Sequence, residues 1–152
     1  MSTSVCRRPF VLDDDADEVA VIAAHEEGLR VLRGALRRVW VDVITDLPWP
    51  AQVQGAVRAL GQLAERRHCG QVDIEVDVDD DEQFELVVAV SPFTIGVEGR
   101  SETDEEIYSA SDNGRGLWLA LTPAEEADFR RRLTERGAEP NAVTYQPPRR
   151  RR

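Results

Sequence analysis

The chain has 152 residues, 41% of them apolar, and a formal net charge of −10. This length can bury a core without disulfides or metal ions, and the composition excludes wholesale disorder. No apolar run approaches the ~20 residues that a membrane-spanning helix needs, and no secretory signal pattern opens the chain. We therefore expect a soluble, cytoplasmic protein.

Arginine and acid are unevenly spread. All 19 basic residues are arginine, a composition typical of GC-rich bacterial or phage genomes, so abundant arginine by itself does not indicate binding. Residues 71–112 contain fourteen Asp or Glu and a single arginine, which gives −13 for this segment. We expect one folded domain over residues 9–146, with flexible ends at residues 1–8 and 147–152.

The first half of the chain predicts one strand and two helices. Residues 9–12 are expected to form a short edge strand. Residues 18–43 are expected to be mostly helical, because apolar side chains recur there at spacings of 3 and 4. The β-branched residues in 39–45 leave an extended conformation open for that part. A second helix is expected to begin at Pro50 and to end near Gly70.

Residues 72–91 are the segment around which the fold is expected to be organised. Apolar and acidic residues alternate strictly over residues 72–79, and an apolar period of two resumes from Phe84 to Val90. The acidic run at residues 79–82 separates the two parts. We interpret this segment as a β-hairpin with an acidic tip.

The rest of the chain predicts further strands and one helix. Short strands are expected at residues 93–97, 107–110, 117–121 and 142–145, and Asn113-Gly114 favours a turn between the second and third of these. Thr122, Pro123 and Glu125 form a capping-box pattern for a helix that ends before Gly137. The predicted fold is α+β: an antiparallel meander of four to six strands with about three helices packed on one face.

The candidate site is an acidic face of this sheet. Acids that alternate with apolar residues point to one side of a strand, and a row of like charges is tolerated only where it is wet or meets cations. Two aromatic residues could serve as anchors for a partner. The expected partner-binding residues are Asp73, Glu75, Asp77, Asp79, Glu85, Tyr108 and Trp118.

Other chemistries find little support in the sequence. Cys6, His25, His68 and Cys69 lack the spacing of a zinc site, and the acidic run lacks the calcium-loop pattern. We therefore expect no metal, no cofactor and no catalytic residues. We also expect no membrane association and no direct nucleic-acid binding, because the chain as a whole is acidic.

These observations favour a non-catalytic binding module of the inhibitor, immunity or accessory type that docks a basic macromolecule, in particular a basic protein. The alternative is a self-assembling subunit of phage or mobile-element type. Such a subunit would form a homo-oligomer through the apolar stripe of residues 29–43 or through an open sheet edge. A small enzyme without a recognisable motif is the third interpretation.

Overall fold

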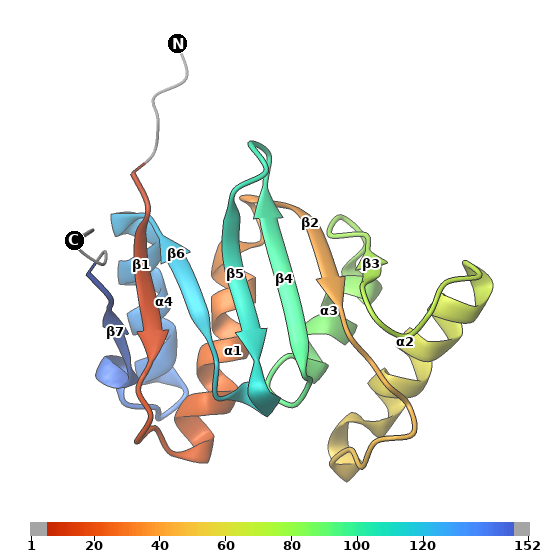
Figure 1. Ribbon diagram of the computed structural model, residues 1–152. Helices are drawn as coiled ribbons and strands as arrows, with labels where there is room; N and C mark the ends of the chain where they lie inside the picture. The colour runs from red at the N-terminus through yellow and green to blue at the C-terminus, as the bar shows by residue number, and fades with distance from the viewer. Residues whose placement is uncertain (1–5, 148–152) are drawn as a thin grey trace, which may run out of the picture.

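The computed structural model describes residues 6–147. Over these residues the chain forms one antiparallel sheet of seven strands, in the order β3-β2-β4-β5-β6-β1-β7, and four α-helices. Helices α1, α3 and α4 lie behind the sheet, and α2 extends the helical layer beyond the β3 edge (Figure 1). The α+β class is confirmed, with more strands than the four to six expected.

The bounds of the elements are as follows. The strands are β1 Arg8–Leu12, β2 Leu36–Val41, β3 Ile74–Val76, β4 Gly96–Ser101, β5 Glu106–Ser111, β6 Trp118–Leu121 and β7 Val143–Tyr145. The α-helices are α1 Glu18–Leu32, α2 Gln54–Arg66, α3 Asp81–Val90 and α4 Pro123–Glu135. Short 3₁₀ turns occupy Ala51–Val53, Asp112–Gly114 and Pro140–Ala142.

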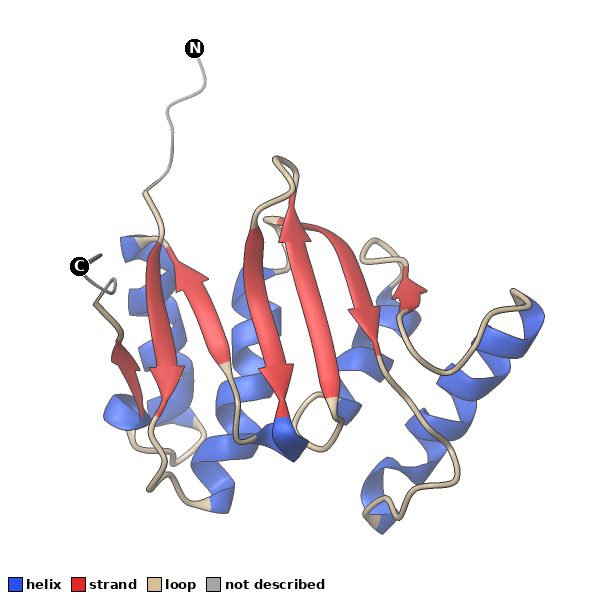
Figure 2. Ribbon diagram, viewed as in Figure 1, coloured by secondary structure: helices blue, strands red, loops and turns tan. Residues whose placement is uncertain are grey.

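The core lies between the sheet and the helices. Every second residue of the central strands points to the helical layer and is buried, as at Val39, Val97 and Leu119. Tyr108 faces the same way, and its hydroxyl forms a hydrogen bond with the Ser91 hydroxyl of the α3 C-cap. Burial raises the pKa of Tyr108, so its hydroxyl stays protonated. The opposite face of the sheet carries none of the four α-helices (Figure 2).

The helix expected over residues 18–43 is wrong in its second half. Helix α1 ends at Leu32, and Leu36–Val41 is strand β2. Apolar residues recur across the turn between α1 and β2 because both elements contribute buried residues to the same core. Val39, Trp40 and Val41 are β-branched or aromatic, which favours the extended conformation left open for this part.

The hairpin expected over residues 72–91 is also wrong. Three residues form β3, and the run that follows is helix α3. Asp80 is the N-cap of α3, and its side chain accepts a hydrogen bond from the Gln83 backbone N–H at 3.0 Å. Asp81 and Glu82 occupy the first turn, where negative charge is favoured. The acidic run is therefore explained by the start of a helix.

Several other predictions are confirmed. Helix α2 buries Val57, Leu60 and Leu63 as expected, and α4 begins with the complete capping box of Thr122 and Glu125. Strands β5 and β6 pair antiparallel, with Tyr108 opposite Leu119. Two other strand predictions are wrong: the strand expected at residues 93–97 lies at Gly96–Ser101, and the strand expected at an edge over residues 9–12 is β1, which lies inside the sheet between β6 and β7.

The two ends of the chain are described only in part. Most of the flexible ends expected at residues 1–8 and 147–152 lies outside the described residues. Arg8 is the first residue of β1, and Arg7 forms an ion pair with Glu125 of α4. None of the helices in residues 6–147 is both long enough and apolar enough to cross a membrane.

Helices α1 and α4 are joined by a buried carboxylate. The Glu27 side chain is 8% exposed and forms ion pairs with Arg30, Arg132 and Arg136 at 3.1, 3.1 and 3.4 Å. Three guanidinium groups around one carboxylate satisfy its acceptor positions. This cluster fixes the two helices against each other behind the sheet.

At each edge of the sheet, one backbone carbonyl group accepts a hydrogen bond from an arginine side chain. Arg67 donates a hydrogen bond to the Glu75 carbonyl on β3, and Arg130 donates to the Val143 carbonyl on β7 at 3.0 Å. Each edge strand has three residues. Short edges with occupied carbonyl groups resist pairing with another strand.

Candidate functional site

The face of the sheet opposite the helices carries one continuous row of side chains. The strand registers place seven residues side by side, one from each strand: Glu75, Trp40, Glu98, Ser109, Trp118, Val11 and Thr144. Directly paired residues point to the same face, and each of the seven is exposed or half-buried. We call this side of the sheet the open face. At ~4.8 Å per strand the row is about 29 Å long.

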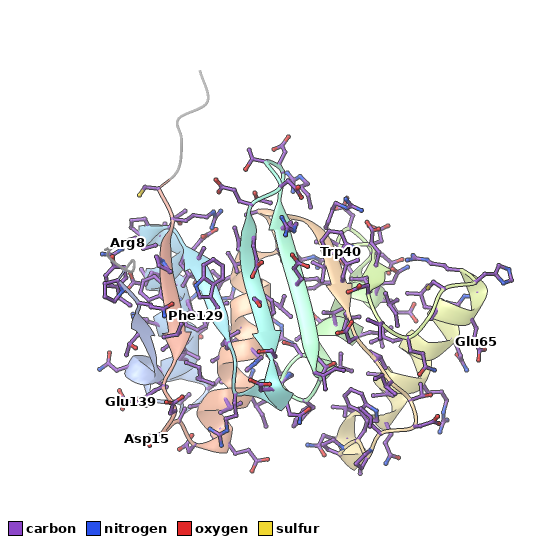
Figure 3. The ribbon with its side chains drawn as sticks, viewed as in Figure 1. Arg8, Asp15, Trp40, Glu65, Phe129 and Glu139 are labelled. Carbon is purple, nitrogen blue, oxygen red and sulfur yellow. The ribbon has the colours of Figure 1, made fainter. Side chains whose placement is uncertain are left out.

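Two tryptophans stand in this row. Trp40 on β2 is labelled in Figure 3, and Trp118 lies three strands away on β6, at a distance of about 14 Å. Both are half-buried. An antiparallel sheet can leave one face to water, and that face is then usually polar. Trp40 and Trp118 are large aromatic side chains on such a face, and this residue type is among the most enriched at interface centres.

The arginines of the open face are held by its own acids. Arg38 forms an ion pair with Glu75 at 3.3 Å, and its guanidinium carbon lies 4.6 Å from the Trp40 ring centroid. Arg100 forms an ion pair with Glu98 at 2.7 Å. Both arginines are therefore already engaged within the chain, and the remaining acids decide the charge that a partner meets.

A hollow of about 300 Å³ lies beside Trp40 on the open face. Its titratable lining residues are all acids, Asp42, Asp73, Glu98 and Glu106, and Ser109 and Ser111 add hydroxyl groups. We call this the Trp40 hollow. Asp42 is fixed because its Oδ1 accepts a hydrogen bond from the Asp73 backbone N–H at 2.8 Å.

Gly96 makes room for the Asp42 carboxylate. A Cβ atom at position 96 would lie 2.6 Å from Asp42 Oδ2, closer than real Cβ contacts. Any other residue at this position would displace the carboxylate. The position of the Asp42 carboxylate therefore depends on a glycine in the neighbouring strand β4.

A second hollow, of about 500 Å³, lies on the other side of Trp118. Val11, Thr144 and Gln146 line it from β1 and the β7 end, together with Asp13, Asp14 and Arg115 near the α1 start. Arg115 donates a hydrogen bond to the Ala16 carbonyl at 3.0 Å. The open face thus has a hollow beside each tryptophan.

A larger hollow lies elsewhere, between α2 and residues 45–49. It measures about 670 Å³, and its charged lining residues, Arg58 and Glu65, have opposite signs. Amide side chains and Trp49 complete the wall. This mixture defines no particular chemistry, and the Trp40 hollow is the more specific site.

The residues predicted for partner binding are only partly brought together. Glu75 and Trp118 lie in the row across the open face, and Asp73 lines the Trp40 hollow. Asp77 and Asp79 lie in the turn before α3, at the end of the sheet. Two predicted residues are away from this face.

Glu85 was placed on this face because residues 72–91 were interpreted as a hairpin, and Tyr108 because the register of its strand was not known. Glu85 is on α3, where its carboxylate pairs with Arg30 at 3.2 Å. Tyr108 is fully buried on the helical side of the sheet. Neither can contact a partner on the open face.

Sequence reasoning missed Trp40, Asp42, Glu98 and Ser109. The signal was present at residues 39–42, where buried valines alternate with Trp40 and Asp42. The helical interpretation of residues 18–43 concealed that alternation. Glu98 lies outside the strand predicted at residues 93–97, whereas β4 spans Gly96–Ser101.

Within residues 6–147, no group of three or more His, Cys, Asp or Glu side chains is arranged to hold a metal ion. The acids of the Trp40 hollow thus form no metal cluster.

Comparison with protein-family models, curated proteins and solved structures finds no match for this chain.

Proposed function

We propose that this protein is a non-catalytic binding module that docks a basic protein partner on the open face of its sheet. The observation that carries the proposal is the row of seven side chains, with Trp40 and Trp118 three strands apart on a face that the four α-helices leave uncovered. Inhibitor, immunity-type and accessory proteins act in this way.

Charge supports a basic partner. Asp42, Asp73 and Glu106 line the Trp40 hollow and form no ion pair with the described residues. The arginines nearby are already paired. A partner with a positive patch would be steered to this face and would lose affinity as salt rises.

The proposal is tested by placing an arginine at the centre of the open face. Ser109→Arg adds bulk and positive charge between the two tryptophans. Immobilised wild-type and variant chains would be exposed to lysate of the source cells at low and high salt, and bound proteins would be quantified by mass spectrometry. We expect a basic protein that binds the wild-type chain at low salt and is recovered at least about tenfold less by Ser109→Arg, equivalent to ~1.4 kcal/mol.

The matched control is Thr134→Arg, which also replaces a hydroxyl side chain by arginine, at an exposed position of α4 in the helical layer. This variant should recover the partner as the wild-type chain does. Thermal unfolding of both variants shows whether each is folded. Equal recovery by a folded Ser109→Arg chain would contradict the proposal.

A further inference from the structure

We infer that the Trp40 hollow receives an arginine side chain of the partner. This inference rests on the proposed function and names the chemical group that the open face recognises. A guanidinium group is planar, carries donors that match carboxylates and stacks on aromatic rings. The hollow offers both kinds of acceptor, an indole wall and several carboxylates.

The carboxylates are placed to receive such a group. Asp42 and Asp73 approach the hollow from the β2 and β3 side, and Glu106 from β5. The hydrogen bond between Asp42 Oδ1 and the Asp73 backbone N–H leaves Asp42 Oδ2 without a hydrogen bond among the described residues. Ser109 and Ser111 add hydroxyl groups to the lining of the hollow. A cation entering the hollow therefore meets three acids that form no ion pair with the described residues, although the charge of Arg100 acts on Glu106 from the neighbouring strand.

The Trp40 ring already contacts one guanidinium group of the same chain. Arg38 lies over the Trp40 ring at 4.6 Å, so this ring stacks with a guanidinium group within the chain itself. The volume of about 300 Å³ is at the small end for a ligand site and suits one side chain better than a whole ligand. These features favour a single anchoring residue over a separate small molecule.

The test uses the full chain and short peptides. A capped Gly-Gly-Arg-Gly-Gly peptide and its citrulline counterpart differ in charge and have almost the same shape. Each would be titrated into ¹⁵N-labelled protein, with the Trp40 indole N–H and the Gly96 and Ser109 amides as reporters. We expect the arginine peptide to bind at least about tenfold more tightly than the citrulline peptide.

Two variants and one control locate the effect. Asp42→Asn keeps the acceptor for the Asp73 N–H, and Glu106→Gln changes an exposed side chain, so both should fold. Each should weaken arginine-peptide binding several-fold. Glu102→Gln, which removes an acid from the β4–β5 turn outside the hollow, should leave it unchanged.

The inference fails if arginine and citrulline peptides bind alike, or if neither hollow variant weakens binding. It fails separately from the proposed function. A partner lost by Ser109→Arg but retained by Asp42→Asn and Glu106→Gln would leave the docking face standing and would overturn the arginine anchor. A partner retained by Ser109→Arg would overturn the docking face itself.

Discussion

His25 is fully buried, and only one of its two ring nitrogens has a hydrogen-bond partner among the described residues. Its Nδ1 lies 2.8 Å from the Val21 carbonyl, and its Nε2 has no hydrogen-bond partner among the described residues. Burial lowers the pKa of His25 to about 4, and the hydrogen bond to Val21 opposes the shift. The folded chain therefore holds the neutral ring, because a proton on Nε2 would be buried without an acceptor.

This residue predicts a loss of stability in mild acid. The unfolded chain binds a proton at His25 below about pH 6.5, and the folded chain resists it until about pH 4. The free energy of unfolding should therefore fall by about 3 kcal/mol in total as the pH drops from 6.5 to 4. Urea unfolding at a series of pH values measures this.

His25→Leu should remove most of that slope. Some loss will remain, since the hydrogen bond from Arg131 lowers the pKa of Asp128, and protonation of Asp128 also favours the unfolded chain. The His25 ring protons, followed by NMR, should titrate near pH 4. An equal slope in the variant, or a titration midpoint near 6.5, would contradict this account.

At the scale of the element, α3 depends on its cap. Asp80→Ala removes the side chain that accepts from the Gln83 N–H and should lower the free energy of unfolding by about 1 kcal/mol. Asp79→Ala changes the adjacent exposed acid, whose side chain forms no hydrogen bond with the described residues, and should cost less than about 0.5 kcal/mol. Equal losses from the two variants, measured by denaturant unfolding, would show that Asp80 is not the cap.

The elements that could be predicted are those with strong local signals. Helix α4 carries Thr122, Pro123 and Glu125 at its start, and these residues form a complete capping box. The turn between β5 and β6 contains Asn113 and Gly114, which have positive φ values of 55° and 99°. Such residues specify backbone geometry without help from the rest of the fold.

The hairpin predicted over residues 72–91 was wrong because its apolar spacing fits two structures. Phe84, Val88 and Val90 alternate like a strand, yet Phe84, Val87 and Val88 also match one face of a helix. The cap at Asp80 with Gln83 three residues later could have decided between them. At the candidate site, the period of two predicted that Trp118 faces away from the core. The position of Trp40 and Glu98 in the same row depends on the strand order, which local sequence does not encode.

At the scale of the whole molecule, two acidic turns of residues 71–112 lie at the same end of the sheet. Strands β3 and β4 both run antiparallel to β2, so the turns after them lie at the same end (Figure 1). One turn holds Asp77, Asp79 and Asp80, and the other holds Glu102 and Asp104. This end would attract a basic partner over a distance of about 10 Å before it contacts the open face.

The apolar stripe on which the self-assembling alternative rested is buried within the chain. Leu29, Leu32, Leu36, Val39 and Val43 of the expected stripe are all at most 1% exposed. Arg67 and Arg130 bind outward-facing carbonyl groups at the two sheet edges.

Site-specific crosslinking tests the open face as the docking surface most directly. A photoreactive phenylalanine derivative would replace Ser109 in one chain and Thr134 in another, and both would be irradiated in the source cells. The proposed function predicts a crosslinked basic protein from position 109 and none from position 134. Crosslinking from position 134 alone would place the partner on the helical layer and would contradict the proposal.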